Sequence, residues 1–352
     1  MEIFRKNYLY LAEVYQNHWI MNNFIRLIYF IPLMVILLSN SVVAQQDAQF
    51  SQYMFNGFYY NPAVAGNDGR ANFFLTHRTQ WLGYAATFGD DGGSPQTQMF
   101  SATAPFVYVP NTGIGLHVVR DQRGPVSSIE AQLSFSYHLD VFGGQGKLSI
   151  GARGGIYNQT LDAGKLRFVD ETNDQVAQTL KNNTLTASKP DMAFGVWYNQ
   201  EDFYVGIAGN HLLGSKINFG LDGLNNALAR NLYITGGYNY PLNDQWLLQP
   251  SVIIKTLPEN GLRTTSIEIS ALGTYNQKFW GGLAYRQSDA VTALIGMYPT
   301  KDNRMRIGYA FDYVVSGRQG KAPTSHEIFL SYGLPVKRYN KPTQETPRHG
   351  TR

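Results

Sequence analysis

The side chains that most often carry catalysis or bind metals are few and scattered in this chain. It has seven histidines and no cysteine, so disulfides and thiolate-metal sites are excluded. His326 and Glu327 lack the second histidine of a zinc-protease motif. GDDGG at residues 89–93 lacks the alternating acidic ligands of a calcium loop, and no G-x-S-x-G nucleophile elbow occurs. The sequence therefore predicts no enzymatic activity, no metal site and no cofactor.

The remaining chemical candidates are charged residues in the middle of segments that otherwise alternate between apolar and polar side chains. A dry core could not hold such charges unpaired, whereas a water-filled lumen could. Two roles stay open for them: they pair with one another or with water and support the wall, or they bind a plug segment or a translocating partner. The candidate set is Arg153, Lys255, Glu268, Arg286, Arg304, Arg306 and Asp312.

Alternation with a period of two is the pattern that positions these charges. In SIEAQLSFSYHLD, residues 128–140, Leu133 and Phe135 fall on one side of an extended chain, and Ser134 and Ser136 fall on the other. The alternating segments are about 9–14 residues long, whereas soluble strands average about 5–6 residues and bilayer-crossing strands need about 9–11. We therefore predict an all-β fold, a transmembrane antiparallel β-barrel of about 14 strands over residues 70–334.

Composition is consistent with a barrel and excludes a helical membrane protein. Charged residues make up 15% of the chain, against about 25% in typical soluble domains. Aromatic residues reach 14%, yet the mean hydropathy is only −0.25. A soluble all-β protein remains the alternative on composition alone. The net charge of +4 comes without a dense basic patch, so nucleic acid is not an expected partner.

Connections and aromatic residues predict how the barrel is oriented. Short polar turns alternate with longer connections, as in outer-membrane barrels with short periplasmic turns and longer outer loops. An even strand number places both termini in the periplasm. Aromatic residues expected near strand ends, as an interfacial girdle in contact with lipid, are Tyr240, Trp246, Tyr275, Phe279, Tyr309 and Tyr332.

The N-terminal residues 1–44 read as an upstream extension plus a signal peptide. Arg26 precedes an apolar run over residues 27–38, and Ala44 ends a stretch of small residues suited to cleavage. Met21 would be a normal start for this signal, and a retained anchor is the alternative. At the other end, residues 335–352 form a basic tail that we expect to be periplasmic.

Residues 45–69 form a separate N-terminal segment between the cleavage site and the first strand. Its core, QFSQYMFNGFYYNPAVAGNDG, is dense in aromatics and amides and contains the turn signals Asn61-Pro62 and Asn67-Asp68-Gly69. We predict that it packs against the periplasmic rim or inside the lumen as a partial plug, with residues 66–69 turning the chain into the first strand. The candidate plug side chains are Phe50, Tyr53, Phe55, Tyr59, Tyr60, Asn61 and Pro62.

The same segment opens a series of motifs that resemble the PorP/SprF family of outer-membrane proteins of the type IX secretion system and its gliding machinery. Further matching blocks follow in order, among them RTQWLGY at residues 78–84, GIGLHVVRDQRGP at 113–125, QPSVIIKT at 249–256 and RIGYAFDY at 306–313. The resemblance spans about residues 47–334 and is carried by the order of the blocks. The sequence departs from the family pattern at AATFGDDGG, residues 85–93, which lengthens one expected outer loop.

The resemblance implies a non-enzymatic barrel in the outer membrane of a Gram-negative bacterium. Such a barrel works with periplasmic secretion components and supports export or surface attachment of a partner protein, such as a large adhesin. The partner protein is engaged through the partner's own C-terminal region. One alternative is a diffusion channel or small-solute transporter of the fatty-acid-channel type. A second alternative is a structural barrel that anchors periplasmic complexes through its basic tail.

Overall fold

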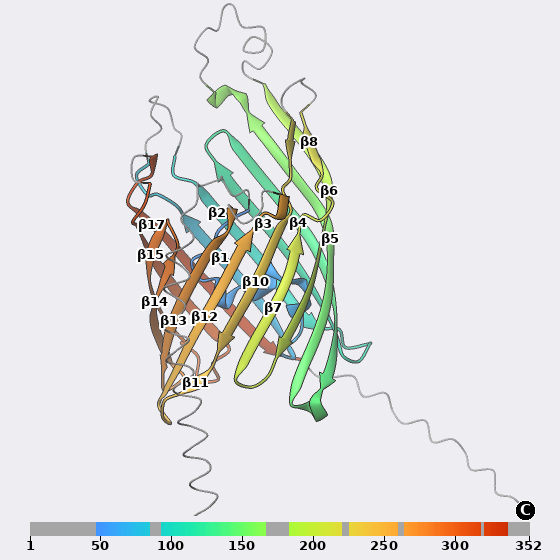
Figure 1. The fold of residues 1–352 in the computed structure, drawn as a ribbon, viewed down its shortest axis with the longest axis vertical. Helices are drawn as coiled ribbons and strands as arrows, with labels where there is room; N and C mark the ends of the chain where they lie inside the picture. Colours follow the sequence, from blue (N-terminus) through green and yellow to red (C-terminus); the bar gives the residue numbers. More distant parts are fainter. Residues whose placement is uncertain are drawn as a thin grey trace, which may run out of the picture. The chain divides into compact units, whose positions relative to one another are not determined.

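Hydrogen-bonded antiparallel pairing runs without a break around the protein. The computed structural model describes residues 47–84, 93–166, 183–219, 225–259, 264–317 and 320–336. Within them, strands pair in the order β10-β7-β6-β5-β4-β3-β2-β1-β17-β16-β15-β14-β13-β12, and β12 pairs with β10 to complete the circle. The result is a closed antiparallel β-barrel of 14 strands (Figure 1). The predicted fold class is confirmed.

The barrel strands are β1 (Arg70–Thr79), β2 (Gln96–Pro105), β3 (Thr112–Arg123), β4 (Val126–Val141), β5 (Gly146–Asp162), β6 (Thr184–Asn199), β7 (Phe203–Asn210), β10 (Asn231–Tyr238), β12 (Trp246–Thr256), β13 (Ser266–Tyr275), β14 (Phe279–Arg286), β15 (Ala290–Met297), β16 (Met305–Val314) and β17 (Thr324–Pro335). The short elements are the helices η1 (Tyr53–Phe55), α2 (Gly57–Tyr60), η2 (Pro62–Val64), η3 (Phe142–Gly144) and η4 (Ala163–Lys165) and the strands β8 (Lys216–Asn218), β9 (Asn225–Ala227) and β11 (Tyr240–Pro241).

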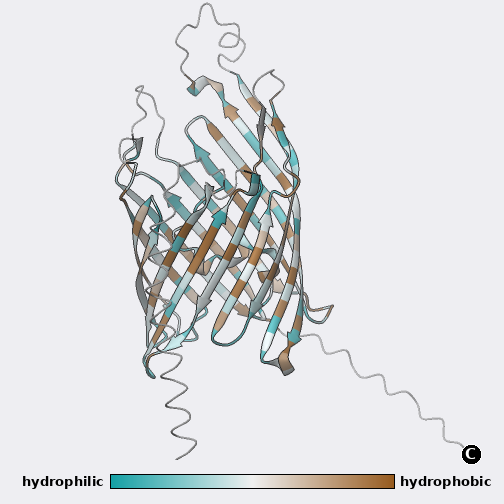
Figure 2. Ribbon diagram, viewed as in Figure 1, coloured by the Kyte–Doolittle hydropathy of each residue, from teal (hydrophilic) through white to brown (hydrophobic). Residues whose placement is uncertain are grey.

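Along the barrel strands, outward-facing side chains are mostly apolar and inward-facing side chains are mostly polar. On β4, Leu133 and Phe135 are 67% and 50% exposed, whereas Ser134 and Ser136 between and beside them are buried. Figure 2 shows this alternation as brown and teal bands along the strands. A water-soluble barrel would have the opposite arrangement, so the outer surface is suited to hydrocarbon. Among the described residues, no helix is both long enough and apolar enough to cross a bilayer.

The first and last strands close the barrel. Arg70 lies opposite Pro335 and Thr79 opposite His326, so the chain enters and leaves the barrel at the same end. We call this the short-turn end, because the turns there are brief and polar, as in residues 200–202 and 276–278. The connections at the opposite end that span residues 80–95, 163–183 and 211–230 are longer.

Three details differ from the sequence-based expectation. Strand β6 begins at Thr184 rather than near residue 191, because its polar start pairs with β5 as far as Asp162. The expected loop over residues 211–230 contains the small β8–β9 sheet. Tyr309 lies in the middle of β16, not near its end, and donates to or accepts from His326 at 2.6 Å.

Aromatic side chains gather at the short-turn end as expected for an interface. The rings of Trp246 and Tyr275 lie 4.9 Å apart, and Phe279 is the cross-strand partner of Tyr275. The predicted signal peptide and extension, residues 1–44, and the tail residues 337–352 lie outside the described residues. The chain divides into two units, residues 1–43 and 44–352, and every described residue belongs to the second.

The interior of the barrel is occupied by residues 47–69, which we call the plug segment (Figure 1, blue). Its backbone lies so close to the wall that glycine is required there. A Cβ atom on Gly113 of β3 would lie 2.0 Å from the carbonyl oxygen of Ala65, and one on Gly151 of β5 would lie 2.4 Å from the amide nitrogen of Ala63. One side of the lumen is therefore shaped to fit the plug backbone.

This fit predicts a difference between two glycines of β5. Gly151→Ala should lower the free energy of unfolding by about 1–3 kcal/mol, because the added methyl overlaps the plug backbone. Gly154→Ala places its methyl on the outer face, 4.0 Å from the nearest atom, and should change stability by no more than about 0.5 kcal/mol. Urea unfolding in lipid vesicles, followed by tryptophan fluorescence, measures both; equal losses would contradict the assigned contact.

Candidate functional site

The plug segment combines three short helical turns with a dense set of buried aromatic side chains. The turns satisfy much of its backbone within the segment, and Asn61 caps η2 by accepting from the amide of Ala63 at 2.9 Å. Phe50 and Tyr59 meet edge to face at 5.1 Å. Of the seven predicted plug side chains, Phe55 is half-buried and the others are buried; they are Phe50, Tyr53, Tyr59, Tyr60, Asn61 and Pro62.

Aromatic contacts attach the plug segment to the β14–β17 side of the wall. The ring of Phe55 lies 4.7 Å from Trp280 of β14 and 5.1 Å from Phe329 of β17. Tyr53 reaches Ser251 of β12 at 3.0 Å through its hydroxyl. These rings belong to a buried apolar cluster in the lumen that also contains Ile253, Leu272 and Leu294.

Hydrogen bonds from the start of the plug segment converge on one carboxylate of the last strand. Glu327 accepts from the amide of Ser51 at 2.7 Å and from the amide of Gln52 at 3.0 Å. The Ser51 hydroxyl donates to Asp312 of β16 at 2.7 Å and also accepts from Arg78 of β1. Two backbone donors that have no partner within the plug are thereby satisfied by the barrel.

Glu327 and Asp312 belong to a chain of buried ion pairs that we call the lumen charge network, residues 78, 268, 286, 312 and 327. Arg78 contacts Asp312 at 2.6 Å and Glu327 at 3.4 Å. Arg286 contacts Glu268 at 2.8 Å and Asp312 at 4.0 Å. All five side chains are at most 2% exposed, so each charge depends on its partners for compensation.

The network continues to the end of the barrel opposite the short turns. Asp289, in the tight turn between β14 and β15, accepts from Arg286 at 3.1 Å and from Lys321 at 2.7 Å. Burial alone would raise the pKa of Asp289, but these two cations outweigh it and hold the pKa below its usual value.

The sequence-predicted charges do not form one group. Glu268, Arg286 and Asp312 lie within the lumen charge network. The ammonium group of Lys255 lies 5.3 Å above the ring of Tyr60 in the plug segment. Arg306 lies 5.4 Å above the ring of Phe55. Arg304 is at the short-turn end, 40% exposed and paired with Asp302 at 2.8 Å.

Arg153 holds the plug segment from the opposite wall. It donates to the carbonyl oxygens of Phe58 and of Tyr59, the latter at 2.8 Å, and its guanidinium lies 4.9 Å above the Phe58 ring. A third donor, its Nε, is bonded to Ser134 at 3.0 Å. This one cation therefore compensates carbonyls at the end of α2 that have no partner within the helix.

A second attachment, absent from the predicted set, joins the first described residue of the plug to the wall. His211 follows β7 and adopts a φ of 56°. Its two ring nitrogens contact Asp47 at 2.6 Å and Asp191 of β6 at 2.7 Å, and Tyr233 of β10 donates to Asp47. We call Asp47, Asp191, His211 and Tyr233 the histidine latch.

Electrostatics favour the charged imidazole in the histidine latch. Burial opposes the charge, but the carboxylates of Asp47 and Asp191 outweigh burial and hold the pKa of His211 well above its usual value. The same contact acts on Asp47: burial raises its pKa, but the cationic His211 holds it below the usual value. The latch is thus a cation held between two anions.

Arg78, Glu327 and the histidine latch are the functional residues that sequence reasoning missed. Arg78 and Glu327 follow the same alternation as the predicted charges, so that pattern could have included them. The latch carries no comparable signal, because Asp47 and His211 are 164 positions apart and both lie outside strands. In the described part of the chain, no cluster of three or more His, Cys, Asp or Glu side chains is arranged to hold a metal ion.

Comparisons with known proteins give one family match and several structural similarities. The model of the family described as type IX secretion system membrane protein PorP/SprF matches residues 42–332. No curated protein matches the chain.

Solved structures to which the barrel is similar include two toluene transporters and a FadL homologue. The toluene transporter TbuX of Ralstonia pickettii is 14% identical, with a TM-score of 0.47 over 81% of this chain and 93% of that one. The Pseudomonas putida toluene transporter TodX is 13% identical, with a TM-score of 0.45 over 85% and 96%. A FadL homologue of Pseudomonas aeruginosa is 13% identical, with a TM-score of 0.39 over 78% and 92%.

Removing the central cation should strongly destabilise the barrel. Arg78→Met leaves Asp312 and Glu327 buried with less compensation and should lower the free energy of unfolding by about 3–5 kcal/mol. Lys165→Met breaks an exposed pair, 3.7 Å from Asp162, and should cost at most about 1 kcal/mol. The two variants are compared by urea unfolding in vesicles. Similar losses of unfolding free energy in the two variants would show that the lumen charge network does not hold the plug segment in place.

The histidine latch should make stability depend on pH. Because the pKa of His211 is higher in the folded protein, its stabilisation is complete below the unfolded-state pKa of about 6.5. It is lost as pH rises through the folded-state pKa. Relative to His211→Gln, the wild-type free energy of unfolding should therefore fall as pH rises above about 6.5. The exposed His77→Gln serves as control and should keep the wild-type profile; an unchanged profile in His211→Gln would refute the latch.

Proposed function

Because this chain belongs to the type IX secretion system membrane protein PorP/SprF family, we propose that it supports the export or surface attachment of a partner protein through that partner's C-terminal region. The family match over residues 42–332 is the observation that carries the proposal, since it includes the plug segment and nearly the whole barrel. The proposed partners are a secreted or surface-attached cargo, such as a large adhesin, and the periplasmic components of the secretion system.

The occupied lumen favours attachment of the cargo at the barrel over passage through it. The plug segment is held by the lumen charge network, by Arg153 and by the histidine latch, which lie on different sides of the wall. Moving it aside would break the bonds of Glu327 to the plug amides, the bonds of Arg153 to the plug carbonyls and the pair of His211 with Asp47, a cost of a few kcal/mol for each buried charge that loses partners. We therefore assign the cargo to the outer loops and rim of the barrel.

The proposed orientation places the short-turn end in the periplasm of a Gram-negative cell. Outer-membrane barrels have short periplasmic turns and long outer connections, and the chain enters and leaves at the short-turn end. The longer connections, including the described parts of residues 80–95 and 211–230, then face the cell exterior. The outward-facing apolar side chains contact outer-membrane lipid.

The proposed role is mechanical and requires no catalysis. Many buried polar groups of the lumen bond to one another or to the plug segment, as in the contacts of Glu327 with Ser51 and Gln52. Their arrangement stabilises a filled barrel. A nucleophile positioned beside a base and an oxyanion site, the geometry that hydrolysis requires, plays no part in the proposal.

Deletion of the gene followed by proteomics of the cell surface and culture supernatant tests the proposal. One or a few surface proteins should be lost from the surface, while other secreted proteins and outer-membrane barrels stay at wild-type levels. Complementation with the full chain should restore them, because the defect is specific to the missing attachment partner. An unchanged surface and supernatant proteome would overturn the proposal.

Planar-bilayer recording distinguishes the channel alternative. A barrel filled by the plug segment should show no steady conductance, and the deletion strain should take up small solutes at the wild-type rate. Steady conductance of the full chain, together with an unchanged surface proteome, would instead favour a diffusion channel.

A further inference from the structure

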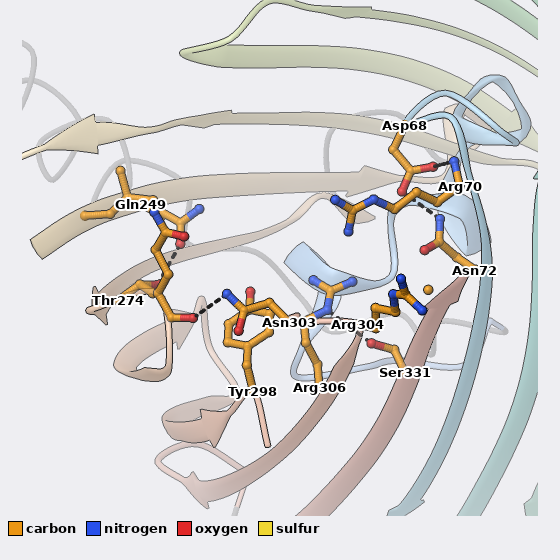
Figure 3. A pocket seen from close by; sticks show the side chains of 13 residues that line it. Asp68, Arg70, Asn72, Gln249, Thr274, Tyr298, Asn303, Arg304, Arg306 and Ser331 are labelled. Atoms are coloured by element: carbon orange, nitrogen blue, oxygen red, sulfur yellow. Dashed lines mark hydrogen bonds between the residues drawn. The ribbon is translucent and has the colours of Figure 1, made fainter. Parts of the chain in front are cut away.

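A cavity of about 370 Å³ opens in the lumen at the short-turn end, below the plug segment. It lies between the β12–β13 and β16–β17–β1 sides of the wall, and its lining includes Gln249 and Thr274 on one side and Ser331 on the other (Figure 3). Ligand-binding pockets have volumes of about 300–1,000 Å³, so the space suits a few side chains. We call it the vestibule.

The vestibule has an excess of positive charge. Arg70, Arg304 and Arg306 all line it, and Figure 3 shows them on the same side of the space. Asp68 is the single acidic residue among the lining side chains. Its carboxylate already accepts from the amide of Arg70 at 3.2 Å and from Asn72 at 2.7 Å. A ligand in the vestibule therefore meets three guanidinium groups, of which that of Arg304 is also paired with Asp302 at 2.8 Å, and one engaged carboxylate.

Two of the three arginines, Arg304 and Arg306, are held by neighbouring side chains. Arg306 donates through Nε to Ser331 at 3.1 Å and rests 5.4 Å above the ring of Phe55, so the plug segment forms the inner boundary at this point. Arg304 is anchored by Asp302 at 2.8 Å. Arg70 begins β1 and Arg306 lies in β16, and these two strands pair with β17 on either side of it; Arg304 directly precedes β16. Donors fixed on strands lose little entropy when a ligand binds.

Amide and hydroxyl groups form the facing wall. Thr274 donates to Gln249 at 3.0 Å, and Gln249 donates to Asn239 at 2.9 Å. Asn303 donates to the carbonyl oxygen of Gln277 at 3.1 Å. Such groups can both donate and accept, which matches a peptide backbone, while a guanidinium fork matches a carboxylate in two-point contact.

We propose that the vestibule binds an acidic peptide segment of a partner protein, with glutamate or aspartate carboxylates on Arg70, Arg304 and Arg306. The chain's own C-terminal sequence, KRYNKPTQETPRHGTR at residues 337–352, is basic and is repelled by the same charges. The occupant is therefore another protein. Placing that protein in the periplasm rests on the proposed function; the binding itself does not.

Calorimetric titration of the purified full chain in uncharged detergent tests the vestibule. The probe is an acetylated and amidated hexapeptide that alternates glutamate with serine, and its control replaces glutamate by glutamine. The glutamate peptide should bind more weakly as salt rises, and the glutamine peptide should not bind. The double variant R70Q/R304Q should weaken binding about tenfold or more, the loss expected for a charge-assisted hydrogen bond.

The matched control is Lys301→Gln, which removes an exposed charge in the β15–β16 turn outside the lining and should leave binding unchanged. Equal weakening by Lys301→Gln, or no binding by the wild type, would overturn the proposal. Inorganic phosphate that displaces the peptide with similar affinity would reassign the vestibule to small anions and overturn it too. If R70Q/R304Q does not fold, R304Q alone makes the same comparison. Because binding is measured on the isolated protein, it can fail or succeed independently of the secretion phenotype.

Discussion

The requirement that buried charges be compensated governs the interior of this barrel. Arg78 lies among Asp312, Glu327 and Ser51 with at most 2% of its side chain exposed. Its two carboxylate partners each bond to a further buried group. Glu327 receives two plug amides, and Asp312 is shared with Arg286. In a wide aqueous pore these charges would be hydrated individually. Here the plug segment keeps water away from the charges, so the charges must compensate one another. The plug segment in turn depends on them for hydrogen-bond partners.

The two sides of the wall hold the plug segment by different means. On the side of β3 and β5, glycines such as Gly113 and Gly151 let the backbones touch, and Arg153 reaches the carbonyls of α2. On the side of β14–β17, aromatic packing and the lumen charge network dominate. Close backbone contact therefore positions the plug segment on the first side. Aromatic packing and the lumen charge network position it on the second side. The combination fixes the plug's register more tightly than burial of aromatic rings alone, because apolar contact has little directional preference.

Local sequence patterns predicted the wall well, and pairwise contacts inside it poorly. Alternation around Leu133 and Ser134 reveals both the strand and the face that meets lipid, because that information is contained within a few residues. The first residue of a strand was harder to predict where the strand begins with polar residues, as β6 does at Thr184. The partners of Arg78 lie 234 and 249 positions away, and no local pattern specifies such a pair. Seven aromatic or turn-forming residues marked the plug segment, but Asp47 and His211 show no feature that distinguishes them from ordinary loop residues.

The seam between β1 and β17 has a consequence for closure of the barrel. Arg78 and Glu327 face each other directly across this seam, and Glu327 also binds the amides of Ser51 and Gln52. A barrel that closed without the plug segment would leave that carboxylate with its contact to Arg78 at 3.4 Å and no amide donors. Pairing of β1 with β17 is thus energetically coupled to packing of the plug segment in the lumen. Residues 51–52 and the last strand, far apart in the sequence, therefore stabilise each other in the closed barrel.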